Sequence, residues 1–230
     1  MQFFGTENRK PFFRFFTLTV GRQAGTCIKH MALSCSYNDI KRADFPIERQ
    51  FHVLKHFCEV NPEYRQYLLH NSEYSYEDID NQIKEKGSRF FNSFVSDPLQ
   101  LLDIVVNKFK SDGVEADWLG DRCEVRLNFS KEHFPEGIGE DHIIHIDKLP
   151  DEIKDQLPDL EYETLQRLQF TSQSKKTWTV NMIIKKIDTK PVIITIFPGV
   201  YAPLLPNHEE QTDEEYRKSM EFWSKHILIS

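Results

Sequence analysis

The stretch KTWTVNMIIKKIDTKPVIITIFPG, residues 176–199, contains two runs in which apolar residues recur at every second position. Many of these residues are β-branched, and the short segment TKP at residues 189–191 separates the two runs. Such alternation predicts two strands, and the short connection predicts a β-hairpin. The predicted core face is formed by Trp178, Val180, Met182 and Ile184 on the first strand and by Val192, Ile194 and Ile196 on the second. The hairpin therefore predicts an antiparallel sheet in the C-terminal half.

Three further segments extend this region. RCEVRLNF (residues 122–129) alternates between polar and apolar residues, and DHIIHID (residues 141–147) is a short isoleucine-rich run, so both are predicted strands. TDEEYRKSMEFWSKHIL (residues 212–228) is a predicted helix, because Thr212 and Glu215 match the capping box. The predicted apolar stripe of this helix is formed by Tyr216, Met220 and Trp223.

The region from residue 44 to residue 113 has the period of helices. Pro46, Pro62 and Pro98 each stand at a suitable first helical turn, and Gly113 is a suitable C-cap. Apolar residues recur between them at three- and four-residue spacing. The predicted helical segments are residues 47–60, 62–69, 75–95 and 99–112.

These patterns predict an α+β fold, with a helical N-terminal half followed by an antiparallel sheet and a C-terminal helix. Residues 1–113 are expected to form a strand at Phe12–Val20 plus the helical region. Residues 114–230 are expected to form the sheet region with the closing β-hairpin and the last helix. The two parts could also form one continuous domain.

The charge of the chain is negative and unevenly distributed. The formal net charge is −7, but residues 1–43 contain seven Lys and Arg against two Asp and Glu. Nucleic-acid-binding proteins usually present a basic surface, because neutralised phosphates supply much of the affinity. The acidic remainder therefore argues against a broad nucleic-acid interface and leaves room for a small local one.

The composition also bears on the compartment. The chain has no apolar run of about 18 residues, so no membrane-spanning helix and no membrane partner are predicted. Its first residues lack the pattern of a secretory signal. The four cysteines are too sparse for a disulfide scaffold, which indicates reduced thiols. We expect a cytoplasmic protein.

The stretch GEDHIIHID, residues 139–147, contains two histidines three positions apart. On a strand these histidines point to opposite faces, so they cannot bind one metal ion together. His145 lies among carboxylates, whereas His142 shares a face with Ile144 and Ile146. His142 is therefore the candidate general acid or base, and a structural histidine at the edge of the core is the alternative.

The segment FTSQSKKTWT, residues 170–179, combines hydroxyl and amine groups before the hairpin. Such groups can bind phosphate oxygens or stabilise developing negative charge. A solvated loop is the alternative, because polar clusters between periodic segments are ordinary loops. The candidate binding residues are Ser172, Ser174 and Thr177, and the candidate amines are Lys175 and Lys176.

Two cysteines and two histidines have a spacing that a zinc site could use. Cys27, Cys35, His52 and His56 form the pattern C-x7-C-x16-H-x3-H. Histidines four residues apart share a helix face, as a zinc site can require. The gap between the cysteines is wider than usual, so buried thiols and surface histidines are the alternative.

The stretch VNMIIKKIDTKPVIITIFPGVYAPLLP, residues 180–206, resembles the closing hairpin of metal-independent toxin ribonucleases of the barnase/EndoU/RelE-like group. The resemblance implies RNA cleavage by general acid–base catalysis on the sheet, without a cofactor. It implies that His142 is the acid or base and that Lys175 or Lys176 stabilises the phosphate. It further implies that Thr195 is the hydroxyl of the last strand and that Tyr201 is a stacking or acidic group.

Three functional hypotheses follow. The first is a metal-independent ribonuclease with its site on the C-terminal sheet and RNA as its partner. The second is a non-catalytic protein, of an immunity, inhibitor or phage-accessory kind, whose acidic surface covers a basic protein partner. The third is a zinc-stabilised interaction domain. The polar segment and the hairpin favour the first, and the charge favours the second.

Overall fold

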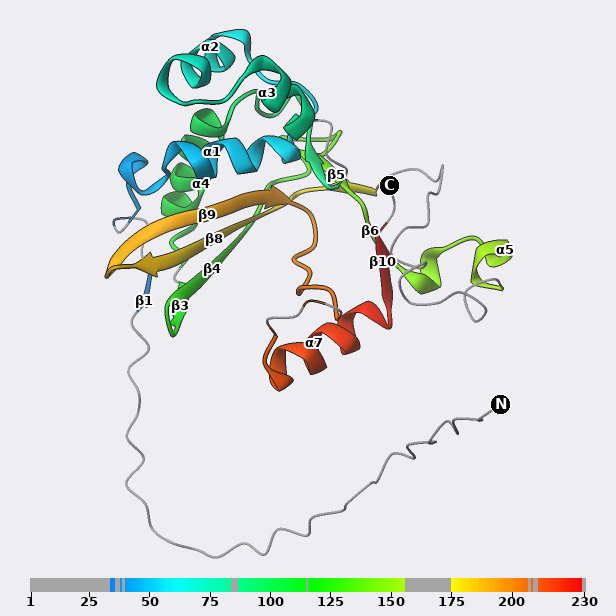
Figure 1. Ribbon diagram of the computed structural model, residues 1–230. Helices are drawn as coiled ribbons and strands as arrows, with labels where there is room; N and C mark the ends of the chain where they lie inside the picture. The colour runs from blue at the N-terminus through cyan, green and yellow to red at the C-terminus, as the bar shows by residue number, and fades with distance from the viewer. Residues whose placement is uncertain are drawn as a thin grey trace, which may run out of the picture. The chain divides into compact units, whose positions relative to one another are not determined.

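The computed structural model describes residues 34–35, 38, 40–83, 87–114, 116–155, 175–206, 208 and 211–228, all within one compact unit of residues 32–230. The predicted strand at residues 12–20 lies outside the described residues. The centre of the unit is an antiparallel sheet of β1 (Ser34–Cys35), β3 (Ala116–Leu119), β4 (Arg122–Asn128), β8 (Thr179–Ile187) and β9 (Lys190–Pro198). Their order across the sheet is β1-β3-β4-β8-β9 (Figure 1).

The predicted hairpin is confirmed as β8 and β9. Its turn lies at Asp188 and Thr189, whose φ angles of 49° and 69° suit the two-residue turns that match the twist of a hairpin. The predicted turn at residues 189–191 was therefore placed one or two positions too late.

A β-bulge in β9 changes the predicted core face of this strand. Ile183 pairs with Thr195 but Ile184 pairs with Ile193, so Ile194 is an extra residue. The bulge brings Ile193 and Ile196 to the same buried face, where both are 0% exposed. The prediction that Val192 and Ile194 share the face of Ile196 was wrong, because alternation does not continue through a bulge.

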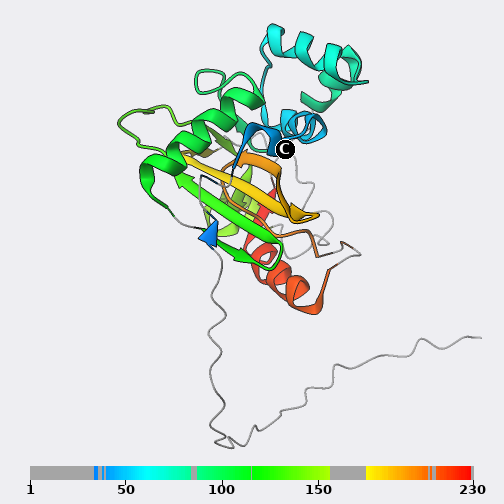
Figure 2. The same ribbon diagram turned by 90° about the vertical axis from the view of Figure 1, so that its left-hand side faces the viewer.

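Helices cover the sheet on both sides. The helices α1 (Ile47–Val53), α2 (Pro62–Asn71), α3 (Tyr76–Ile83) and α4 (Pro98–Asp112) lie on one side, and α7 (Asp213–Trp223) lies on the other (Figures 1 and 2). The α+β class is thus confirmed. None of the described helices has the length and apolar content that crossing a membrane requires.

The caps of the helices explain which predictions succeeded. Asp97 accepts a hydrogen bond from the Gln100 amide at the start of α4, and Gly113 ends this helix in the left-handed conformation.

The predicted helical segments at residues 47–60 and 75–95 were too long. The chain leaves the helical conformation so that the buried rings of Phe57 and Phe90 can meet, with a β-bridge between the two residues.

Two smaller sheets lie beside the central one. The strands β2 (Arg89–Phe90), β5 (Gly139–Asp141) and β7 (Lys175–Thr177) form an antiparallel sheet in the order β2-β5-β7. The strands β6 (Ile143–His145) and β10 (His226–Leu228) form an antiparallel pair. The predicted single strand at residues 141–147 is therefore divided at His142 between two sheets.

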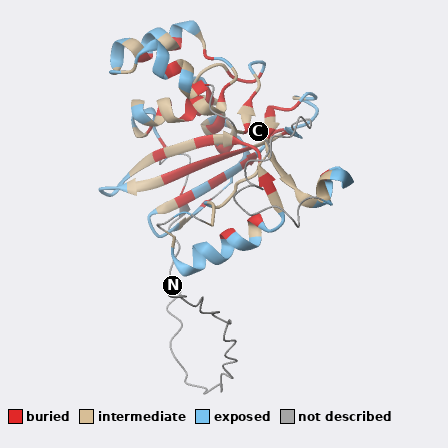
Figure 3. Ribbon diagram, turned by 45° about the vertical axis from the view of Figure 1, so that its right-hand side comes forward, coloured by how far each residue is buried: buried red, intermediate tan, exposed pale blue. Residues whose placement is uncertain are grey.

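The C-terminal helix is shorter than predicted and uses a different face. It ends at Trp223 because residues 226–228 pair with β6 and bury Ile227. Ser219 and Trp223 are buried, whereas Tyr216 is 49% exposed and Met220 is 40% exposed (Figure 3). The predicted apolar stripe is therefore wrong for two of its three residues.

One buried cluster joins α1 to α4 with the central sheet. It contains residues from both sides of position 113, where the sequence predicts a boundary. Phenylalanine supplies much of its volume, through Phe45, Phe57, Phe90, Phe94, Phe109 and Phe129. This core fixes β2 beside β5, and that pairing creates the candidate site.

Candidate active site

Four polar side chains share one face of the β2-β5-β7 sheet. Arg89 pairs with Glu140, and Glu140 pairs with Lys176. Residues opposite each other in antiparallel strands point to the same face, so these three side chains form a row. His142 follows directly after β5, and its imidazole lies against Glu140. We call Arg89, Glu140, His142 and Lys176 the polar face.

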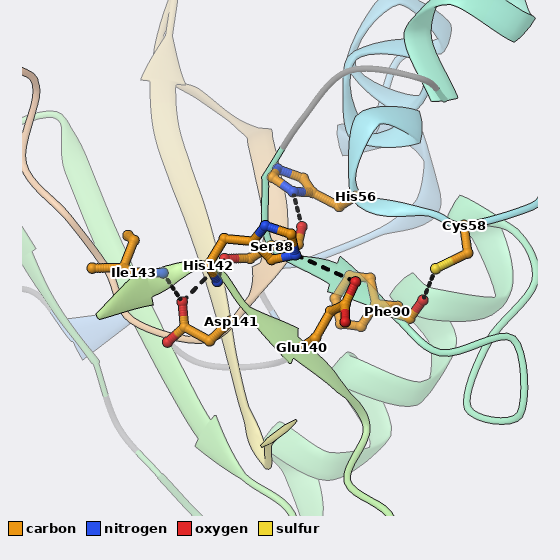
Figure 4. A network of polar contacts seen from close by, with 8 residues as sticks. All are labelled: His56, Cys58, Ser88, Phe90, Glu140, Asp141, His142 and Ile143. Carbon is orange, nitrogen blue, oxygen red and sulfur yellow. Dashed lines mark hydrogen bonds and ion pairs between the residues drawn. The ribbon is translucent and has the colours of Figure 1, made fainter. Parts of the chain in front are cut away.

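Within the polar face, His142 and Glu140 are in contact (Figure 4). The Nε2 atom of His142 lies 3.3 Å from Glu140 Oε1, and their side chains are only 17% and 26% exposed. The backbone N–H of His142 donates a hydrogen bond to Ser88 Oγ at 3.2 Å. The contact places an imidazole and a carboxylate side by side on the polar face.

Lys176 forms an ion pair with a residue outside the polar face. Its ammonium group pairs with the carboxylate of Glu136, and this pair lowers the pKa of Glu136. Both side chains are exposed, so solvent screens the pair and it contributes little to stability. A bound anion can therefore take the place of Glu136 at little cost.

Asp141 points to the opposite face of β5 and is buried, with 2% exposure. Its Oδ1 accepts hydrogen bonds from Ser88 Oγ at 3.1 Å and from the Ile143 amide at 3.0 Å (Figure 4). Its Oδ2 accepts one from the Val200 amide at 2.9 Å. Asp141 therefore ties β5 to the segment before β2 and to the segment after β9.

The neighbouring nucleophiles are not activated. Ser88 Oγ donates to Asp141 rather than to an imidazole, so no Ser–His–Asp arrangement exists here. Cys58 Sγ donates to the Phe90 carbonyl at 3.4 Å, and burial raises the pKa of this thiol. A thiol with a raised pKa is a poor nucleophile, so this region is suited to acid–base rather than covalent chemistry.

His56 lies beside the polar face but is held neutral. Its Nδ1–H donates to the Ser88 carbonyl at 2.9 Å (Figure 4). Burial lowers the pKa of His56 to about 3, with Lys55, His52 and Arg89 adding to the effect. His56 is a structural donor, and its ring lies beside that of Phe197, with the two ring centroids 5.7 Å apart.

A polar concavity lies between β4, β7 and the ends of β8 and β9. It has a volume of about 440 Å³. Four cationic side chains line it, and we call it the basic cleft: Arg126, Lys131, Lys175 and Lys176. Thr177 also lines the cleft, so the structure brings together three of the predicted site residues here.

The remaining predicted site residues lie elsewhere. Thr195 is in β9, and its hydroxyl has no hydrogen-bond partner within the described part of the chain. Tyr201 accepts a hydrogen bond from Arg122, and burial raises the pKa of its phenol. Neither lines the basic cleft, and neither does His142, so the single convergence implied by the resemblance is not found. Ser172 and Ser174 are outside the described residues.

The predicted zinc ligands are dispersed as far as the structure describes them. Cys27 is outside the described residues. The hydrogen bond between the buried Cys35 and Cys123 thiols, together with burial, raises the pKa of Cys123. The helix of His52 ends at Val53, before His56. In the described ranges, no three His, Cys, Asp or Glu residues lie close enough to hold a metal ion.

Sequence reasoning missed Glu140, Arg89, Arg126 and Lys131. Glu140 could have been found, because it stands two positions before His142 and immediately before the predicted strand at residues 141–147. Arg89 could not, because only the pairing of β2 with β5 brings it to the site.

No family model matches the chain, and no curated protein or solved structure shows significant similarity to it. Its function is therefore argued from the geometry of its own residues.

Proposed function

We propose that the protein is a metal-independent ribonuclease and that its polar face carries out the reaction. The observation that supports this proposal most strongly is the contact between His142 and Glu140 in a row that also contains two cations. This set contains the two kinds of group that RNA cleavage needs, namely proton-transfer groups and donors to a phosphate.

The reaction begins when the 2′-hydroxyl of RNA attacks the adjacent phosphorus. The bond from phosphorus to the 5′-oxygen breaks, which leaves a 2′,3′-cyclic phosphate and a 5′-hydroxyl. One group must take the proton of the 2′-hydroxyl and another must give a proton to the 5′-oxygen. We assign these two roles to His142 and Glu140, whose side chains lie 3.3 Å apart on the polar face.

The two cations stabilise the charge that develops on the phosphate. Arg89 flanks Glu140 on β2, and Lys176 flanks it on β7. A guanidinium group can donate two parallel hydrogen bonds to phosphate oxygens, and an ammonium group adds a point charge. The proposed substrate phosphate therefore lies across β5, between the two outer strands.

The first prediction concerns His142. We expect His142→Ala to lower the rate of RNA cleavage at least about 100-fold, because general acid–base groups typically contribute 10²–10⁴-fold. The measurement is turnover of a fluorescent single-stranded RNA in the presence of EDTA. His145→Ala is the matched control, since His145 lies in the same stretch but on the β6–β10 pair. Equal rates for the unchanged protein and His142→Ala, or an equal loss in His145→Ala, would refute the proposal.

A second candidate is a non-catalytic protein that binds a basic partner. It is supported by the net charge of −7 and by the acidic first turns of α3 and α7. This candidate gains support if the protein forms a stoichiometric complex with a basic protein and no RNA turnover is detected with the unchanged chain.

A further inference from the structure

Two of the four cations that line the basic cleft have no counterion among the residues that the structure describes. Arg126 and Lys175 make no side-chain hydrogen bond or ion pair with any described residue. Both side chains are exposed, and both border the same volume of about 440 Å³. In a chain with a net charge of −7, two unpaired cations at one concavity indicate an anionic ligand.

A third cation is held in place over an aromatic ring. The Lys131 ammonium lies 4.8 Å from the centroid of the Trp178 ring, a cation–π contact. Trp178 is itself fixed, because its Nε1–H donates to the Phe134 carbonyl at 2.6 Å. Lys131 therefore reaches the cleft with part of its conformational freedom already lost, which lowers the entropic cost of binding.

The carboxylate that lines the cleft does not oppose an anion strongly. Asp141 accepts three hydrogen bonds, from Ser88 Oγ and from the amides of Ile143 and Val200. These donors partly offset the negative charge of the Asp141 carboxylate and hold the carboxylate in the protein interior. The exposed part of the cleft is therefore dominated by its cations.

We propose that the basic cleft binds the phosphate backbone of single-stranded RNA. This inference rests on the proposed ribonuclease function and names the path of its substrate. Lys175 and Lys176 are neighbours on β7 and point to opposite faces. Because β7 is an outer strand of the β2-β5-β7 sheet, an RNA strand that crosses this strand passes from the cleft to the polar face.

The dimensions of the cleft favour a single strand over a duplex. Its volume of about 440 Å³ is that of a pocket for a small ligand, which is enough for a nucleotide-sized unit. Proteins that bind single strands combine a positively charged groove with aromatic side chains, and the half-buried Trp178 lines this cleft. A duplex is a wide, stiff object and cannot enter it.

The test separates binding from cleavage by the use of 2′-O-methyl RNA, which lacks the attacking hydroxyl. We expect Arg126→Gln/Lys175→Gln to weaken the binding of a labelled 2′-O-methyl oligonucleotide about tenfold or more, as measured by fluorescence anisotropy. The slope of log K against log salt should fall by about 1.4, since each lost contact to a single strand accounts for about 0.7. Lys186→Gln/Lys190→Gln is the charge-matched control, because both lysines lie at the turn end of the β8–β9 hairpin and neither lines the cleft.

Three results would overturn the inference. The first is affinity of Arg126→Gln/Lys175→Gln within twofold of the Lys186→Gln/Lys190→Gln control. The second is failure of the unchanged protein to bind the oligonucleotide. The third is binding of a duplex of the same sequence as tightly as the single strand. None of these results depends on turnover. Binding of the oligonucleotide through the cleft without cleavage of RNA would therefore refute the proposed ribonuclease function but not the proposed binding of RNA by the cleft.

Discussion

Gly199→Ala is expected to lower the free energy of unfolding by about 3–5 kcal/mol. Gly199 has a φ of +92°, and a Cβ atom on it would lie 2.6 Å from the carboxylate carbon of Asp141. An alanine must therefore adopt a strained backbone, which costs about 1–3 kcal/mol, and must also displace a buried carboxylate, which costs about as much again. Urea denaturation gives the change directly.

Gly113→Ala is the matched control for this prediction. Gly113 also has a positive φ, of +59°, but nothing lies within 4 Å of the Cβ position. We expect it to cost only about 1 kcal/mol, the penalty of the left-handed backbone. If Gly113→Ala and Gly199→Ala cost the same, then the close approach of Asp141 to Gly199 is not important for stability.

The second large effect concerns the protonation of His56. The unfolded chain binds a proton at this residue once the pH falls below 6.5, whereas the folded ring stays neutral down to about pH 3. The unfolded state therefore gains protons over this range, and the free energy of unfolding falls as the pH falls. When the unfolded chain binds one proton more than the folded chain, the free energy of unfolding falls by about 1.4 kcal/mol for each pH unit of acidification. Because part of the residue remains exposed, we expect about 2–3 kcal/mol between pH 7 and about pH 4.

His56→Gln isolates this contribution. Glutamine can still donate to the Ser88 carbonyl but does not titrate. Between about pH 7 and about pH 4, the unchanged protein should lose about 2–3 kcal/mol more stability than the variant. The exposed His133→Gln serves as the control and should keep the pH dependence of the unchanged chain. Identical pH profiles for the unchanged protein and His56→Gln would contradict the buried, neutral state of His56.

Local signals in the sequence predicted the elements that depend on local interactions. The caps of α4 and α7 lie within a few residues of the backbone groups that they satisfy, so Asp97 and Thr212 could be recognised directly. The hairpin was recognised because its alternation is uninterrupted along β8. The bulge at Ile194 and the end of α1 depend instead on contacts between distant residues, which a single sequence does not reveal.

The candidate site shows the same division. His142 could be singled out because strand geometry separates it from His145. The contact of Arg89 with the site depends on the pairing of β2 with β5, about fifty residues further along the chain. The basic cleft likewise joins Arg126 of β4 to Lys175 of β7. Isolated exposed cations of this kind are common in any sequence and predict nothing until the fold brings them together.

Cleavage of RNA by the polar face through the 2′-hydroxyl can be measured with oligonucleotides that contain one ribonucleotide in a 2′-deoxy strand. Four such strands, each with a different base at the ribonucleotide, cover the possible base preferences. In EDTA, we expect the unchanged protein to cleave immediately 3′ of the ribonucleotide and to leave a 2′,3′-cyclic phosphate on the product. We expect no cleavage by His142→Ala. Cleavage at deoxynucleotides, or four strands that all remain intact, would contradict the proposed ribonuclease function.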